Sequence, residues 1–286
     1  MDAETALKKQ FFTAEELPND AYHGGPGISN SGLKLIGSKT PFHFYGQYLD
    51  PNKPARKGSR AMLIGTALHA AVLEPHKFEE EFVVADFRDR GAAGYKAWAK
   101  KQDRHIIMAH EMVNVTNMRR ALYNDPAVAA ILRDALQFEY SVYAEDFETE
   151  ELVRIRCDLV TNGGWIVDLK KCQDASDEGI RKSMFNFGYY HQDAFYTDVW
   201  TMAHQGEAPA GFAFVFVEEQ YPHAVSLVVL DDEDRERGRR EYRRNLDLYA
   251  HCKAHNSWPG YGVGARDISL AFWQRRRIDE KLEDFQ

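Results

Sequence analysis

The sequence predicts a mixed α/β (α+β) domain whose mixed central β-sheet is flanked by helices. Its 286 residues are 44% hydrophobic and 28% charged, a composition that can bury a sizeable core. Up to about residue 136 the apolar residues mostly follow helical spacing, whereas from Tyr140 they alternate as in strands. Further helices and strands then follow one another, and this order favours a sheet covered by helices.

The N-terminal half is expected to be mainly helical. Residues 1–21 are expected to be a poorly ordered N-terminus, residues 22–260 a single domain and residues 261–286 an irregular tail. Ser29 or Asn30 provides an N-cap for a short helix that the segment Ser38-Lys39-Thr-Pro41 ends. The other elements expected here are an aromatic helix or turn over 42–48, a loop over 51–59, a buried apolar helix over 62–73, a short strand over 82–85 and helix over most of 109–136.

The C-terminal half is expected to begin with an antiparallel meander. Alternating residues and two turn segments, 148–151 and 162–164, predict its three strands, which are 141–147, 152–160 and 165–171. The elements expected after the meander are helices over 176–187 and 190–204, strands over 211–217 and 223–229, and an amphipathic helix over about 232–254.

The composition limits the cellular compartments and the kinds of partner that the sequence is compatible with. No apolar run approaches the roughly 18 residues of a membrane span, and the first twenty residues lack a basic region followed by an apolar stretch. We therefore expect a cytoplasmic protein without a membrane partner. Its three cysteines, Cys157, Cys172 and Cys252, show no paired spacing, so free thiols are expected.

The charge balance is acidic but uneven. A net charge of -8 and a pI near 5.8 argue, by themselves, against a nucleic-acid partner. However, residues 31–60 hold six basic side chains against one acid, and residues 86–104 are also rich in Arg and Lys. A locally basic groove on an acidic protein is one interpretation, and solvated charged faces are the other.

The most informative segment is a predicted hairpin that carries Asp158, Asp168 and Lys170. Strand side chains alternate, so Asp168 and Lys170 share one face while Leu169 points into apolar packing. If the strands pair across the 162–164 turn, Asp158 lies opposite Asp168, with Cβ atoms roughly 4.5 to 5.5 Å apart. Two carboxylates this close suit one hard cation, with the Leu169 carbonyl as a further ligand, whereas the alternative is a salt-bridged surface hairpin.

Two helices add polar groups to this pattern. Gln192 and Tyr196 lie one turn apart on one helix face and could bind a phosphate or base, although such a stripe also suits a core. His69 is single on an apolar helix, where it is either a ligand or a buried core histidine. The order along the chain is His69, Asp158, Asp168-Leu-Lys170 and Gln192-x-x-x-Tyr196.

This order resembles the RecB-like branch of the PD-(D/E)xK nuclease superfamily, whose pattern is G-x-x-x-H, Asp, Asp-x-Lys and Q-x-x-x-Y. Gly65-Thr-Ala-Leu-His69, Asp158, Asp168-Leu-Lys170 and Gln192-Asp-Ala-Phe-Tyr196 fill every slot. Within that branch the chain is most similar to the RecE-type exonucleases (exonuclease VIII) of prophage recombination, over about residues 22–260. The resemblance implies a restriction-endonuclease-like core in that domain. One departure is Lys171-Cys172, where the family commonly has hydroxyl residues.

The resemblance also implies an activity and its machinery. It implies a Mg²⁺-dependent exodeoxyribonuclease that degrades linear double-stranded DNA from 5′ to 3′ and leaves 3′ single-stranded tails. It implies a single-strand annealing partner of the RecT type and a ring-shaped homo-oligomer around DNA. By position, His69, Asp158, Asp168 and the Leu169 carbonyl become ligands of two metal ions, Mg²⁺ or Mn²⁺. Lys170 becomes the catalytic lysine, and Gln192 and Tyr196 position the substrate.

Candidate DNA contacts come from the basic segments. Ser29 and Lys34 lie on a helix start, where phosphate binds favourably, but they are equally consistent with a cap and a surface lysine. Arg88 and Arg90 lie near a Gly-rich loop and could grip a duplex.

Two rival functions stay open. A Cas4-like or helicase-associated nuclease would commonly carry four cysteines for an iron-sulfur cluster, and this chain has three. A non-catalytic DNA-binding or assembly module of the same fold would suit the net acidic charge.

Overall fold

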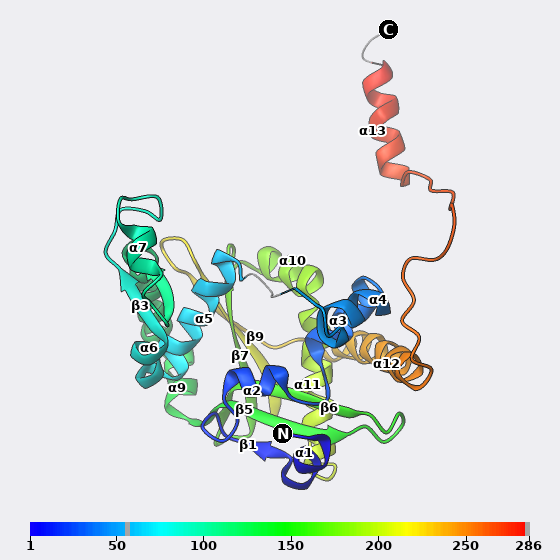
Figure 1. Cartoon of the computed structure of the whole chain (residues 1–286), viewed down its shortest axis with the longest axis horizontal. Coiled ribbons are helices and arrows are strands. Elements are labelled where there is room, and N and C mark those ends of the chain that lie inside the picture. Colours follow the sequence, from blue (N-terminus) through cyan, green and yellow to red (C-terminus); the bar gives the residue numbers. More distant parts are fainter. Residues whose placement is uncertain (55–57, 284–286) are drawn as a thin grey trace.

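A seven-stranded mixed sheet forms the centre of the computed structural model, which describes residues 1–54 and 58–283 (Figure 1). The strand order is β1-β5-β6-β7-β8-β9, and β2 pairs with β6. Pairs β7/β8 and β2/β6 are parallel, and the other pairs are antiparallel. The strands are β1 (Phe11–Phe12), β2 (Ile28–Ser29), β5 (Ala135–Glu145), β6 (Leu152–Thr161), β7 (Trp165–Cys172), β8 (Gly211–Glu218) and β9 (Val225–Val228). The predicted mixed central sheet is confirmed.

Helices cover both faces of the sheet, as predicted. Side-chain alternation divides β8 between two cores, because Phe212, Phe214 and Phe216 enter one core while Ala213, Val215 and Val217 enter the other. The first core is closed by α3 (Asn30–Ser38), α10 (Asp177–Phe187), α11 (Tyr189–Ala203) and α12 (Asp232–Ala254). The second is closed by α5 (Arg60–Leu73), α8 (Ala109–Asn124) and α9 (Pro126–Arg133).

Smaller elements flank this frame. β3 (Phe82–Ala85) pairs in parallel with β4 (His105–Met108), a strand that sequence reasoning missed, and the two form a separate small sheet. The remaining elements are α6 (Pro75–Glu81) and α7 (Tyr95–Ala99) on the side of this small sheet, and α4 (Pro41–Phe44) with a π-helical turn (Tyr45–Leu49) beside α3 (Figure 1).

The N-terminal residues differ from the expectation of poor order. They form α1 (Ala3–Lys9), β1 and α2 (Asn19–Gly24), and β1 adds an antiparallel strand to β5. Ala6, Phe12, Leu17 and Tyr22 bury their side chains in a third core against Tyr143. This contact depends on a strand more than 120 residues away, so the polar local composition concealed it.

The C-terminal tail also differs, because it contains a helix, α13 (Phe272–Glu283), rather than irregular chain alone. This helix lies apart from the body at the end of an extended segment (Figure 1), and none of its residues is buried. Within the described ranges, no helix combines the length and the apolar composition needed to cross a membrane.

Candidate active site

The site lies where the ladder between β6 and β7 ends. The register across the 162–164 turn is the predicted one, because Val160 pairs with Ile166 and Leu159 with Val167. One position further, the Asp158 side chain accepts a hydrogen bond from the Leu169 amide (2.8 Å) in place of a backbone partner. Both Asp158 and Asp168 therefore stand at the point where the paired strands stop, and both line the same cleft.

Asp168 is almost fully buried and is held by two neighbours. Its Oδ1 accepts a hydrogen bond from Gln192 Nε2, and its Oδ2 lies 2.6 Å from Lys170 Nζ. Because Oδ2 is buried, the Lys170 ammonium balances a carboxylate charge that solvent does not reach. Lys170 also sits 4.7 Å from the centre of the Tyr189 ring. Burial by itself would lower the pKa of Lys170. The negative charges of Asp168 and Asp158 outweigh this effect and raise that pKa, so Lys170 stays an ammonium ion at neutral pH.

His69 joins a second group of ligand-type atoms beside Asp158. Its Nε2 is 2.9 Å from the Leu169 carbonyl oxygen, and its Nδ1 is 3.5 Å from Asp158 and 3.9 Å from Glu139. Burial opposes a charged imidazole, yet the two carboxylates raise the pKa of His69 to about 9. Burial, in turn, raises the pKa of Asp158. The two carboxylates therefore favour the protonated form of His69.

Glu139 is a site residue that sequence reasoning missed. It lies on β5 between Phe138, which pairs with Leu159, and Tyr140, which pairs with Cys157, so its place is beside Asp158. Its φ of 48° is uncommon for a residue with a side chain. The predicted strand began at residue 141, whereas β5 begins at Ala135, so Glu139 fell outside the prediction.

Arg156 fixes the Glu139 carboxylate. Its Nε donates to Glu139 Oε2 (2.8 Å), while its Nη1 donates to the Leu17 carbonyl (2.9 Å). Burial alone would raise the pKa of Glu139, but His69 and Arg156 outweigh it and lower that pKa. Glu139 is thus kept as an anion that faces the site.

These donors fit a hard divalent cation. Ligand atoms of His69, Glu139 and Asp158 all lie within 4.8 Å of one another, and Asp168, paired with Lys170, lines the same cleft. Carboxylate oxygens are the ligands that Mg²⁺ and Mn²⁺ prefer. Asp158, Asp168, Glu139 and His69 would hold such an ion. The Leu169 carbonyl, also expected as a ligand, is bonded to His69 in this arrangement.

The cleft that contains these groups has a volume of about 560 Å³. The start of α3 forms part of its wall through Ser29, Asn30 and Ser31, and Tyr196 lines it from α11. Ser29 is the N-cap of α3, although its hydroxyl contacts Ser31 (3.0 Å) rather than a helix amide. The structure therefore brings His69, Asp158, Asp168, Lys170, Gln192, Tyr196 and Ser29 together.

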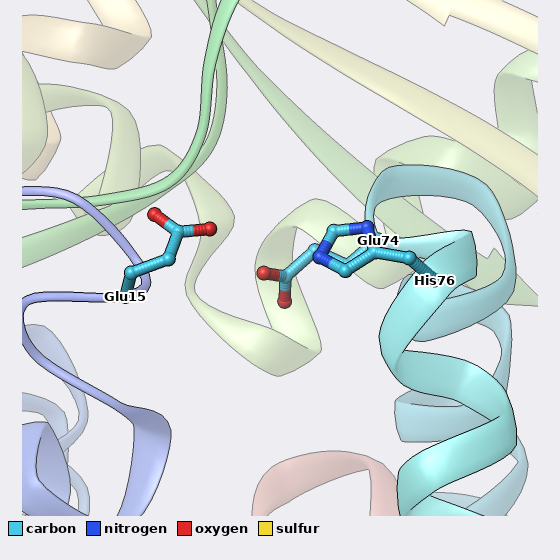
Figure 2. A group of neighbouring side chains, drawn as sticks. All are labelled: Glu15, Glu74 and His76. Atoms are coloured by element: carbon cyan, nitrogen blue, oxygen red, sulfur yellow. The ribbon is translucent and has the colours of Figure 1, made fainter.

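Another part of the cleft is acidic (Figure 2). Glu15, from the N-terminal segment, faces Glu74 and His76 across the cleft mouth, with ligand atoms within 4.8 Å of one another. Lys77 forms an ion pair with Glu74. Because the Glu74 carboxylate is already paired with Lys77, this group forms the acidic rim of the cleft rather than a second cation site.

Three of the predicted DNA contacts lie outside the cleft lining. Lys34 donates from Nζ to the Phe187 carbonyl oxygen (2.7 Å) beside Tyr189. Arg88 is exposed and forms an ion pair with its neighbour Asp89. Arg90 grips the buried Glu111 with both guanidinium nitrogens (2.8 and 2.9 Å), so its expected role at the DNA is replaced by a structural one.

Comparison with known proteins bears on the fold. A family model described as a PDDEXK-like domain of unknown function (DUF3799) matches residues 29–268. The crystal structure of a presumed exonuclease from Eubacterium rectale is similar with a TM-score of 0.64 at 14% identity, covering 90% of this chain and 96% of that chain. A phage-related exonuclease from Haemophilus somnus 129PT gives a TM-score of 0.36 at 12% identity, covering 80% and 83%. No curated protein matches the chain.

Proposed function

Because the chain belongs to the PDDEXK-like domain family of unknown function (DUF3799), we propose that it is a divalent-metal-dependent nuclease that hydrolyses DNA phosphodiesters. One observation carries this proposal. His69, Glu139, Asp158, Asp168 and Lys170, which come from four separate elements, converge on one cleft. Three carboxylates and a histidine gathered in one cleft suit a bound cation better than a purely structural salt-bridge network.

The chain's own side chains support hydrolysis in distinct ways. Bound Mg²⁺, or Mn²⁺ in its place, would supply charge neutralisation and a more acidic water, with two ions per site as the proposed number. Lys170 is held as a cation by Asp168, so it suits stabilisation of the charge that develops on phosphate oxygens rather than proton removal. Gln192 fixes the orientation of Asp168 through its amide. Tyr196 lines the cleft within reach of a substrate.

The finer proposal is an exonuclease of the RecE type. The ordered motifs from His69 to Tyr196 support a cytoplasmic enzyme that degrades linear duplex DNA from 5′ to 3′ for annealing-type recombination of a phage or prophage. The carboxylates of the cleft mouth, Glu15 and Glu74, support an end-specific action, because they disfavour a phosphate backbone that continues past the site. An annealing protein of the RecT type and a ring-shaped homo-oligomer complete the proposal.

End-labelled digestion tests this function. Linear duplex labelled at either 5′ or 3′ ends, and closed circular duplex, are incubated with Mg²⁺ or with chelator. We expect only the linear form to disappear, only with metal, and from its 5′ ends. Asp168→Ala and Lys170→Ala should abolish digestion, whereas Lys171→Ala, which alters a neighbouring lysine paired with Glu219 (2.6 Å), should retain it.

Other outcomes identify the rivals. Binding of duplex without digestion under any divalent metal would support the non-catalytic DNA-binding or assembly module. Digestion at the wild-type rate by Asp168→Ala or Lys170→Ala would move the active centre elsewhere. The four-cysteine chemistry of a Cas4-like nuclease is disfavoured because the sequence has three cysteines, Cys157, Cys172 and Cys252.

A further inference from the structure

A sharp corner between two helices places an exposed aromatic ring next to the candidate active site. Helix α10 ends at Phe187, and α11 begins at Tyr189. Gly188 joins them with a φ of 61°, a left-handed conformation that favours glycine. A Cβ at this position would also lie 3.0 Å from the Lys34 side chain. The corner directs Tyr189 toward the core while Phe187 stays 59% exposed.

Two lysines meet at this corner. The ring of Tyr189 has Lys170 Nζ at 4.7 Å and Lys34 Nζ at 5.9 Å from its centre. Lys34 also donates to the Phe187 carbonyl oxygen (2.7 Å), which ties α3 to the end of α10. Burial, followed by the charge of Lys170, lowers the pKa of Lys34 to about 8. Asp168 pairs with the Lys170 ammonium, whereas Lys34 donates to the neutral Phe187 carbonyl, so the two lysines together leave net positive charge that an anion could balance.

The Phe187 ring extends this arrangement outward. Its centre lies 5.7 Å from the centre of the Tyr189 ring, which in turn packs on Phe214 and Phe216 of the core. Phe187 is thus the exposed end of an aromatic series that begins in the core. Ammonium groups beside an exposed aromatic face match the two parts of a nucleotide, since its phosphate is anionic and its base has a face that stacks.

We propose that Phe187 is a base-stacking platform for a nucleotide whose phosphate lies at Lys34 and Lys170. This inference rests on the proposed nuclease function and names the part of the substrate that the corner holds. Stacking on an aromatic ring tolerates every base, so the platform would hold a DNA end without reading its sequence. It would place the phosphodiester of that nucleotide beside the catalytic lysine.

Phe185 provides a matched control. It is also exposed, at 76%, and lies on the same helix. Residues two apart on an α-helix point in nearly opposite directions, so Phe185 faces away from the contacts that Phe187 makes. A general effect of removing exposed aromatic surface would act on both residues, whereas a stacking platform would involve Phe187 alone.

The test uses the full-length protein and a linear duplex with a 5′-terminal nucleotide that is either intact or abasic. Duplex affinity is measured with metal chelated, and the first cleavage is measured with Mg²⁺ under single turnover. Phe187→Ala should weaken binding of the intact end by roughly 5- to 150-fold, the range for one stacked base. Phe185→Ala should stay within about twofold, as expected of a surface change. Phe187→Trp should bind at least as well as the wild type.

The abasic end provides the decisive comparison. It should weaken wild-type binding by about as much as Phe187→Ala does, and the abasic end and the substitution together should cost no more than either alone. Equal effects of the two Phe→Ala variants, or fully additive effects of the abasic end and Phe187→Ala, would overturn the platform. Thermal unfolding shows whether each variant is folded, and the exposure of both rings leads us to expect unchanged midpoints.

The result separates the platform from the proposed function. If the wild-type protein digests DNA and the Phe187→Ala variant digests it equally fast, the platform is overturned and the nuclease function stands. Wild-type protein that binds ends without digesting them would overturn the nuclease function, and the affinity measurements would still decide the platform. Failure of the wild type to bind or digest a duplex end would overturn both.

Discussion

At the scale of single residues, Glu139 takes its place in the site through an unusual backbone conformation. Its positive φ re-aims one side chain of β5, and Arg156 then holds the carboxylate at 2.8 Å. A conformation of this kind persists only where surrounding contacts impose it. Here those contacts come from Arg156 and from the paired residues on either side of Glu139. We infer that this carboxylate contributes to cation binding.

Glu139→Gln tests that role. The change keeps the size of the side chain but removes its charge, so we expect digestion to fall about 10- to 100-fold and to require more metal, as for other groups that support metal ligands. Rates are measured across a Mg²⁺ titration. Glu145→Gln, at the exposed end of the same strand, should behave as the wild type. An unchanged metal requirement in Glu139→Gln would place this carboxylate outside the metal centre.

At the scale of elements, Glu111 connects three segments. It is fully buried in the first turn of α8, and it accepts hydrogen bonds from Arg60 of α5, from Arg90 and from the Met108 amide. Burial alone would raise the pKa of Glu111, but these donors, led by Arg90, outweigh it and lower the pKa to about 2. The ion pair between Arg90 and Glu111 explains why Arg90 is not available as a DNA contact.

Glu111→Gln should lower the free energy of unfolding by about 2 to 4 kcal/mol at pH 7. This loss is smaller than the loss on breaking a fully buried ion pair, because Arg60 and Arg90 are partly exposed to solvent. A depressed folded-state pKa stabilises the protein above the ordinary value of 4.5, and this stabilisation is lost as the pH falls toward 2. Urea unfolding at several pH values should therefore show the difference from wild type shrinking below about pH 4.5. Glu178→Gln, in an exposed pair with Lys182, is the control and should change stability by about 0.5 kcal/mol or less.

The N-terminal segment gives a second test at this scale. Phe12 is 6% exposed and packs edge-on against Tyr143, so Phe12→Ala should destabilise the protein by about 2 to 4 kcal/mol. Lys8→Ala, on the exposed face of α1, should leave the thermal midpoint unchanged. Equal midpoints for the two variants would mean that residues 1–21 do not pack on the sheet.

At the scale of the whole molecule, the body and the C-terminal helix are separate. Residues 261–283 contain no buried side chain, and Tyr261 at their start packs edge-on against His43 of the body. Removing residues 262–286 should change the free energy of unfolding by no more than about 0.5 kcal/mol. Chemical denaturation of the shortened and full-length chains checks this, and a large loss would show that the tail packs on the body.

Sequence reasoning recovered most of the fold because its signals are local. The helix expected over about 232–254 is α12 (Asp232–Ala254), and the 162–164 turn determined the register of β6 against β7. The same period of alternation placed Asp168 and Lys170 on one face. By contrast, β4 and the N-terminal elements were missed because short or polar segments acquire their structure from distant partners.

By itself, the sequence determined most of the helices and strands between residues 30 and 254 and the register of the hairpin, and its resemblance to a nuclease family singled out the residues from His69 to Tyr196. Periodicity and turn chemistry act over a few residues, so they can be read without the fold. Only the tertiary structure decided that Glu139 joins that site, that Glu111 captures Arg90 and that Phe187 stands exposed beside Lys34 and Lys170. Each of these depends on a contact between segments that are distant in the chain, or on a backbone angle that such contacts impose.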